Sequence, residues 1–197
     1  MNRFALFFLP AVTGLAADLA TKSYFFANYF DPTRAKDGFP QFAHWWVDGV
    51  FGIQTSTNPG ALFGIGKGHS LLFAAFSIVA LIGILVWLFA MKAARDRWLT
   101  FALGLIAGGI IGNFYDRIGW GYVSTYPLEI KNNVRDWILF RLEGVPLFDP
   151  WPNFNIADSL LVTGAILLFI HAVFFATNAE NQVDPEDSAA ADLEHAH

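Results

Sequence analysis

The sequence of 197 residues contains no cysteine, and only 15% of its residues are charged. Without cysteine the chain has no disulfide framework, no thiol nucleophile and no thiolate metal site. It also lacks the HExxH pattern of a zinc protease and the Gly-x-Ser-x-Gly pattern of a serine hydrolase. The net charge of -5 argues against nucleic acid as a partner. We expect neither a cofactor nor a metal.

Apolar residues, in contrast, make up 55% of the chain, and the mean hydropathy is +0.43. Four stretches, residues 4–26, 70–90, 98–115 and 157–179, approach the roughly 20 apolar residues that a membrane-spanning helix needs. The third stretch is rich in glycine, which lets neighbouring helices approach closely. The sequence therefore predicts an all-α membrane protein built on a bundle of four transmembrane helices. A cleaved signal peptide is the alternative for the first stretch.

The distribution of charge predicts the topology. Lys92, Arg95 and Arg97 lie in the short connection between the second and third stretches, which the positive-inside rule places in the cytoplasm. Both termini are then cytoplasmic, and the long connections, about 29–69 and 116–156, face outward. Residues 1–179 form the membrane domain. Residues 180–197 carry several acidic side chains and no Lys or Arg, which is typical of a disordered cytoplasmic tail.

The first outer connection contains a run of strand-forming residues at positions 50–57, followed by the turn sequence Asn58-Pro59-Gly60. We expect a small strand platform there. Tryptophans such as Trp45 and Trp46 are concentrated in the outer connections. They fit an interfacial aromatic belt, and they equally fit a platform that grips acyl chains.

Charged side chains inside membrane spans are costly, on the order of 3 kcal/mol each on insertion scales, so each one requires an explanation. Asp18 and Lys22 are four residues apart in the first stretch and share a helix face. They form either a structural ion pair or a substrate contact.

Amide and carboxyl side chains recur at the outer ends of the third and fourth stretches. Asn113, Asp116 and Arg117 end the third stretch, where they alternatively represent snorkelling at a helix end. Asn155 and Asp158 open the fourth, where Asp158 alternatively serves as a favourable anion in the first helical turn.

The connection between these two stretches contributes another carboxyl group, that of Asp136. Two carboxyl groups brought together cannot both ionise cheaply, so they share one proton. One then acts as general base and the other as general acid. This is the chemistry of an aspartic protease.

The same residues carry a resemblance to a known family. The chain resembles lipoprotein signal peptidase, the bacterial signal peptidase II, along most of its length. The matching motifs, in order, are Asp18-x-x-x-Lys22, Asn58-Pro59-Gly60-Ala61-Leu62-Phe63, Gly109-x-x-Gly112-Asn113-x-x-Asp116-Arg117, Val134-x-Asp136 and Phe154-Asn155-x-Ala157-Asp158-Ser159.

The resemblance implies a four-helix bundle with a small extracytoplasmic β-cradle in the bacterial inner membrane. We also expect a monomer in contact with membrane lipid. It implies a substrate that is a prolipoprotein carrying diacylglycerol, cut before the lipidated cysteine. Asp136 and Asp158 match the catalytic pair. The positions that orient the substrate backbone and support the pair match Asn113, Arg117 and Asn155. The positions that shape the substrate pocket, where globomycin binds in relatives, match Asp18, Lys22, Asn58 and Gly60. Asp116 matches a structural position.

One stretch departs from the family pattern. Relatives place the first catalytic aspartate soon after the Asp-Arg pair, in a Gly-Tyr-Val-Val-Asp-like run. Here Gly121-Tyr122-Val123 is followed by Ser124, and the next match is Val134-Arg135-Asp136, which implies an insertion of about ten residues. Glu129, inside that insertion, is the alternative to Asp136.

Two other classes of protein compete with a peptidase. A small transporter would also place Asp, Lys, Asn and Arg inside the membrane, but it would spread them through the bilayer depth. A structural membrane protein would leave the clustered amides and carboxyl groups unexplained.

Overall fold

The computed structural model describes residues 2–36, 40–60, 66, 68–149 and 151–180, without the side chains of 175–180. The predicted tail therefore lies, except for its first residue, outside the described residues. The elements in chain order are α1 (Arg3–Tyr29), α2 (Pro32–Lys36), β1 (His44–Val47), β2 (Phe51–Asn58), α3 (Ser70–Leu85), η2 (Val86–Ala90), η3 (Ala93–Arg95), α4 (Arg97–Arg117), η4 (Leu128–Ile130), β3 (Val134–Phe140) and α5 (Ile156–Glu180).

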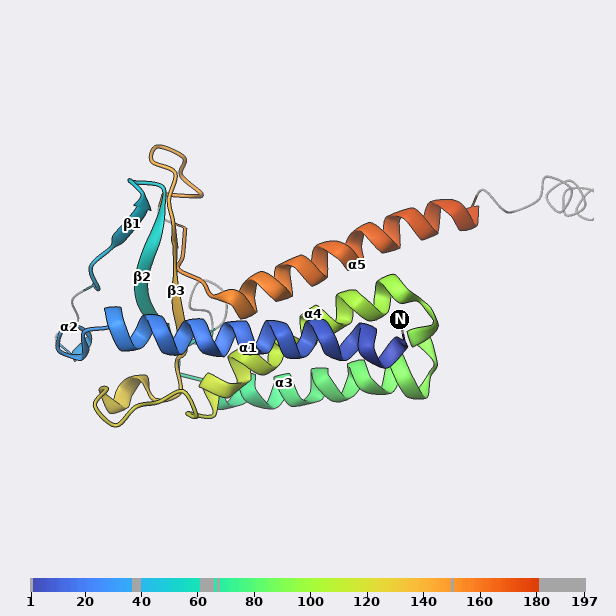
Figure 1. Cartoon of the computed structure of the whole chain (residues 1–197), viewed down its shortest axis with the longest axis horizontal. Helices are drawn as coiled ribbons and strands as arrows, with labels where there is room; N and C mark the ends of the chain where they lie inside the picture. Colours follow the sequence, from blue (N-terminus) through green and yellow to red (C-terminus); the bar gives the residue numbers. More distant parts are fainter. Residues whose placement is uncertain (1, 37–39, 61–65, 67, 150, 181–197) are drawn as a thin grey trace, which may run out of the picture.

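Four helices are long and apolar enough to cross a membrane, which confirms the predicted bundle: Arg3–Tyr29, Ser70–Ala90, Arg97–Arg117 and Ile156–Phe174. The second of them is α3 continued by the π-helical turn η2. Figure 1 shows α1, α3 and α4 running side by side, while α5 diverges from them toward its C-terminal end. Helix α4 is the central element, because it packs against α1, α3 and α5.

Glycines give α4 this central place. A Cβ atom added at Gly104 would lie 2.5 Å from the carbonyl oxygen of Phe7 in α1. One added at Gly112 would lie 2.5 Å from Oδ2 of Asp18 and 3.1 Å from Cβ of Ala157. Real side chains do not approach this closely, so only glycine permits these helix contacts.

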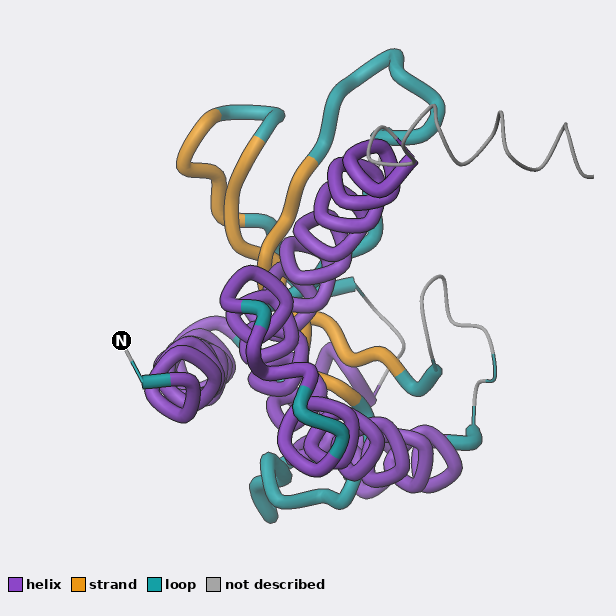
Figure 2. The backbone as a smooth tube through the Cα atoms, turned by 90° about the vertical axis from the view of Figure 1, so that its right-hand side faces the viewer, coloured by secondary structure: helices purple, strands orange, loops and turns teal. Residues whose placement is uncertain are grey.

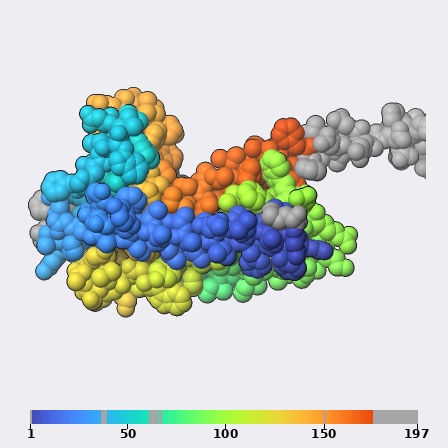
Figure 3. All heavy atoms as spheres, in the orientation of Figure 1, coloured from blue at the N-terminus to red at the C-terminus, as the bar shows by residue number. Residues whose placement is uncertain are grey.

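The three strands form one antiparallel sheet in the order β1-β2-β3. The predicted strand at 50–57 is β2, and β1 and β3 were not predicted. The sheet stands across the C-terminal end of α1 and projects to one side of the bundle (Figures 1 and 3). It is fixed there by a cluster in which the rings of Phe25 and Trp137 stack with centroids 3.9 Å apart.

The opposite end of the bundle is packed differently. A cluster of buried apolar side chains joins α1, η2, η3 and α4 there, and its buried members are Phe7, Ala11, Leu88, Ala94, Leu99, Leu103 and Ala107. Figure 2 shows the bundle from this end, with the strands behind the helices. The polar side chains predicted to form a site lie at the other end, beside the sheet.

Candidate active site

The site is built around the first turn of α5. The side-chain oxygen of Asn155 accepts a hydrogen bond from the backbone N–H of Asp158 (2.9 Å), and Oδ2 of Asp158 accepts one from the backbone N–H of Asn155 (3.2 Å). This reciprocal arrangement is a capping box, which satisfies two backbone donors that a helix start leaves without partners. The residues that start the helix therefore also fix the Asp158 carboxyl group.

Two amide side chains connect Asp158 to Asp136. Nδ2 of Asn113 donates to Oδ1 of Asp158 (2.8 Å), and Nδ2 of Asn155 donates to Oδ1 of Asp136 (2.6 Å). The amides are themselves linked, because Nδ2 of Asn155 also donates to Oδ1 of Asn113 (3.2 Å). Carboxyl groups 22 positions apart in the sequence thus belong to one hydrogen-bonded unit.

Strand β3 supplies Asp136, which pairs with Ser56 of β2 in the antiparallel register. The Asp136 side chain is only 3% exposed. Burial raises the pKa of Asp136 well above its ordinary value, and the negative charge of Asp158 raises it further. Lys22 and the hydrogen bond from Asn155 lower it in part. Asp136 therefore keeps its proton to higher pH than an ordinary aspartic acid does.

A buried ionic network lies directly beside the pair. Nζ of Lys22 is 2.8 Å from Oδ2 of Asp18 and 3.2 Å from Oδ2 of Asp116. The guanidinium of Arg135 binds Oδ1 of Asp116 through Nε and Nη2, both at 2.8 Å. The network also reaches α5, because Oδ1 of Asp18 accepts the backbone N–H of Ala157 at 2.9 Å. Positive and negative charges thus alternate and offset one another.

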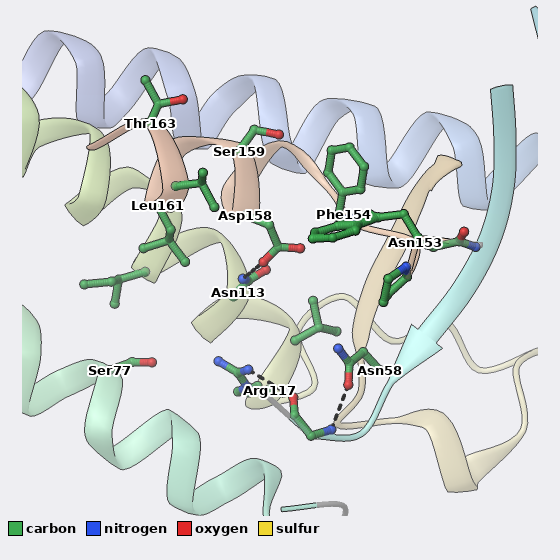
Figure 4. Close-up of a pocket in the computed structure, with 16 residues that line it drawn as sticks. Asn58, Ser77, Asn113, Arg117, Asn153, Phe154, Asp158, Ser159, Leu161 and Thr163 are labelled. Atoms are coloured by element: carbon green, nitrogen blue, oxygen red, sulfur yellow. Dashed lines mark hydrogen bonds between the residues drawn. The ribbon is translucent and has the colours of Figure 1, made fainter. Parts of the chain in front are cut away.

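A cavity of about 650 Å³ opens next to Asp158, between α3, α4 and α5 (Figure 4). Its polar rim includes Asn58 and Arg117. Oδ1 of Asn58 accepts the backbone N–H of Gly60 (3.0 Å), and the guanidinium of Arg117 donates to the Gly60 carbonyl oxygen (3.4 Å). The cavity continues along the bundle past Ser77 of α3 and Thr163 of α5.

The predicted site residues fall into three groups around this cavity. Asn58, Gly60, Asn113, Arg117 and Asp158 line it. Asn155 is buried and hydrogen-bonded to the lining residues Asn113 and Asp158, and Asp136 is buried and hydrogen-bonded to Asn155. The remaining three, Asp18, Lys22 and Asp116, are almost completely buried in the ionic network and are not among the described residues that line the cavity.

Glu129, the alternative to Asp136, lies in η4 with an exposed side chain and is not among the lining residues. Within the described part of the chain, no three His, Asp or Glu side chains gather as metal ligands would. Of the two alternatives, Asp136 is therefore the one that shares a hydrogen-bonded unit with Asp158.

Sequence reasoning missed Arg135, although it named both of its neighbours. Its backbone N–H donates to Oδ2 of Asp116 (3.1 Å), so both the main chain and the side chain of this residue are bound to α4. A signal was available: an arginine directly before a candidate buried aspartate needs an acidic partner, and Asp116 had none assigned.

A linked pair of carboxyl groups beside a cavity, at the sheet end of a bundle of membrane-spanning helices, fits a membrane-embedded hydrolase. Residues 11–174 match the family described as Signal peptidase (SPase) II, and the chain belongs to this family.

Individual relatives agree with this assignment. The chain is 48% identical to the lipoprotein signal peptidase of Rhodopirellula baltica over 183 residues, which cover 93% of this chain and 78% of that protein. It is 32% identical to the lipoprotein signal peptidase of Geobacillus thermodenitrificans over 175 residues, which cover 89% of this chain and 94% of that protein.

Two solved structures of a bacterial membrane enzyme, obtained by the in meso method, have a similar fold. One, at 2.3 Å resolution, superimposes with a TM-score of 0.67 at 28% identity over 86% of this chain and 88% of its own. The other, at 1.9 Å, gives 0.62 at 29% identity over 83% and 90%. The protein is therefore a peptidase of the lipoprotein signal peptidase family, with the four membrane-spanning helices of a bacterial inner-membrane enzyme.

Proposed function

We propose that this protein is an aspartic endopeptidase that removes the signal peptide from diacylglyceryl-modified prolipoproteins by cutting before the lipidated cysteine. The family supports the substrate class, since its relatives are lipoprotein signal peptidases. The observation that carries the aspartic mechanism is the amide-linked pair of Asp136 and Asp158 beside the cavity.

The environments of the two carboxyl groups assign their roles. Asp136 is buried and its pKa is raised well above the ordinary value, so it carries the proton and acts as general acid. Asp158 lines the cavity in the first turn of α5, where the helix dipole and the Asn113 amide favour a negative charge. Asp158 is therefore the general base.

The reaction follows from these roles. Asp158 removes a proton from a water molecule as its oxygen attacks the scissile carbonyl carbon, while Asp136 gives its proton to the carbonyl oxygen. The tetrahedral diol then collapses: Asp136 recovers a proton from a diol hydroxyl, and Asp158 passes its proton to the leaving nitrogen as the C–N bond breaks. Both carboxyl groups regain their starting states, and no covalent intermediate forms.

The cavity supports the proposed substrate. Its rim offers Asn58, Asn113 and Arg117 to the peptide backbone. Its wall includes apolar side chains such as Ile110 of α4 and Leu161 of α5. The lipid anchors would stay in the bilayer and bring the peptide to the rim, so orientation is largely settled before chemistry begins. Membrane residence is then part of the specificity.

We further propose that the pair faces the extracytoplasmic side and that both termini are cytoplasmic, since Lys92, Arg95 and Arg97 lie at the opposite end of the bundle. Residues 1–179 would form the peptidase domain, with the acidic tail 180–197 outside it. A single chain supplies every proposed catalytic and rim residue, which supports a monomer. The concentration of these polar groups at one end favours a peptidase over a transporter.

The decisive experiment follows cleavage of a diacylglyceryl-modified prolipoprotein by the purified protein on a gel-shift assay. Asp136→Asn and Asp158→Asn should each lose at least about 1000-fold in rate, because each removes one half of the acid–base pair. Glu129→Gln is the matched control and should cleave like the wild type. An active Asp136→Asn variant would reassign the acid, and an intact precursor with wild-type protein would refute the peptidase mechanism for this substrate.

A further inference from the structure

Lys22 is a completely buried cation that the proposed reaction does not use. It lies in α1, and its Nζ atom contacts two carboxylates, those of Asp18 and Asp116. A third contact has a different character: Nζ donates to Oδ1 of Asn113 at 3.1 Å. Lys22 is therefore separated from the Asp158 carboxyl group by one amide side chain.

This third contact determines which atom of Asn113 faces Asp158. An ammonium group has only donors, so the Asn113 atom beside it must be the acceptor oxygen. The same oxygen accepts Nδ2 of Asn155, a second donor. With its oxygen held by two donors, Asn113 must present its NH₂ group to Asp158. The opposite orientation would set an amide oxygen against the carboxylate and a hydrogen-bond donor against the ammonium.

Lys22 also contributes charge. The ionisable groups around the aspartate pair are Asp18 and Lys22 from α1, Asp116 and Arg117 from α4, and Arg135 from β3. The sequences of β2 and α3 contain no charged residue. Lys22 and Asp116 act on Asp136 in opposite directions, Lys22 lowering its pKa and Asp116 raising it.

We propose that Lys22 is a positioning residue for the reaction: it holds the Asn113 amide with its NH₂ group toward Asp158 and supplies positive charge behind the aspartate pair. This inference rests on the proposed function and assigns Lys22 a role behind the cavity rather than a contact with substrate. Asp116 also contacts Nζ, and its negative charge partly offsets the positive charge of Lys22. Substrate binding then depends little on Lys22, whereas turnover depends on it.

The test is the pH dependence of kcat/KM for the diacylglyceryl-modified prolipoprotein. In Lys22→Met, loss of the positive charge should move both limbs of the profile up by about one pH unit, because both limbs belong to the coupled pair. In Asp116→Asn, loss of a negative charge should move both limbs down. At the optimum, Lys22→Met should lower kcat about tenfold or more and leave KM within about twofold. Lys92→Met, an exposed lysine at the cytoplasmic end, is the matched control and should keep the wild-type profile.

Opposite displacements in the two variants support the proposal, since a general loss of packing would not change direction with the sign of the charge removed. Activity losses without displacement, or displacements in the same direction, would overturn it. If Lys22→Met does not fold, Asp116→Asn alone decides: a downward displacement supports the role of charge, and an unmoved profile refutes it. Wild-type cleavage and an inactive Asp136→Asn in the same assay show separately that the proposed function holds.

Discussion

The two ends of the bundle are held together by different physics. At the end away from the sheet, which we propose is the cytoplasmic one, α1 and α4 meet through apolar side chains such as Phe7 and Leu103. At the end beside the sheet, which we propose is the outer one, the same two helices meet through the ion pair of Lys22 in α1 with Asp116 in α4, while Lys22 also pairs with Asp18 of its own helix. Each buried charge costs on the order of 3 kcal/mol to insert into a membrane, and apolar packing would have avoided that cost.

The difference indicates that the end with the buried charges carries a cost in stability. Buried ion pairs stabilise little compared with apolar groups of the same shape, so the outer network is poorly explained as a means of holding helices together. It is better explained as support for the proposed carboxyl pair, whose two members must be fixed in orientation and must differ in proton affinity. The comparison predicts that changes at the outer end affect turnover, while changes at the cytoplasmic end affect folding.

After the two aspartates themselves, the largest effect is expected at Asn155, which bonds to Asp136, Asn113 and the backbone of Asp158. Asn155→Ala should lower kcat about 100-fold or more, since it removes the donor to the Asp136 carboxyl group and the acceptor that binds the backbone N–H of Asp158. Steady-state cleavage of the lipidated precursor measures this. Asn28→Ala, which changes an exposed asparagine at the outer end of α1, should keep near-wild-type activity. Equal losses in the two variants would contradict the special place of Asn155.

The next effect is that of pH on the wild-type protein. The pKa of Asp136 is raised, so its protonated form persists to higher pH than in an ordinary aspartic acid. Activity should therefore survive through neutral pH and then fall about tenfold per pH unit once Asp136 loses its proton. A profile of kcat/KM against pH measures this fall. A rate that keeps increasing in alkaline solution would show that no protonated carboxyl group is required.

Two glycines of α4 sharpen the comparison within one helix. In Gly112→Ala, the new methyl group would meet the Asp18 carboxylate, so kcat should fall about tenfold, more than the folded fraction does. In Gly104→Ala, the methyl group would meet the Phe7 carbonyl oxygen and separate α1 from α4 at the cytoplasmic end. That variant should lose thermal stability and keep the kcat of its folded fraction. Melting curves and activity measurements together distinguish the two variants. Equal kcat values in both variants would contradict the proposed difference between the two ends.

The smallest effect on activity is expected in the apolar cluster. Leu103→Ala leaves a gap among buried neighbours at the cytoplasmic end, so it should lower the free energy of unfolding by about 2 kcal/mol. Its kcat should stay within about twofold of the wild type. Chemical denaturation in detergent, together with cleavage of the same substrate, provides both numbers. A large fall in kcat would mean that the two ends are mechanically coupled.

The membrane-spanning helices could be predicted from the sequence because a run of about 20 apolar residues is typical of a helix that crosses a bilayer. Strand β2 was predicted for a similar reason, since its strand-forming residues end in a turn signal at Asn58. The capping pair of Asn155 and Asp158 could also have been recognised in the sequence, because the two residues are only three positions apart.

Other contacts depend on how distant segments fold together. Asp18 accepts the backbone N–H of Ala157, 139 positions later, and no local pattern predicts such a bond. Arg135 reaches its partner Asp116 only because β3 packs against α4 in the folded chain. Strand β1 was missed because His44–Val47 is short, and its pairing with β2 includes a bulge. Composition thus predicts the elements, whereas the buried partners of charged groups require the assembled fold.

The cavity beside Asp158 reaches past Val162, a side chain that is 59% exposed on the face of α5 where lipid would lie. If a membrane-anchored substrate enters there, its supply is a search in two dimensions. The relevant concentration is then molecules per area of bilayer rather than per volume of solution. Diluting enzyme and substrate with additional lipid would slow cleavage even when their amounts in the tube are unchanged.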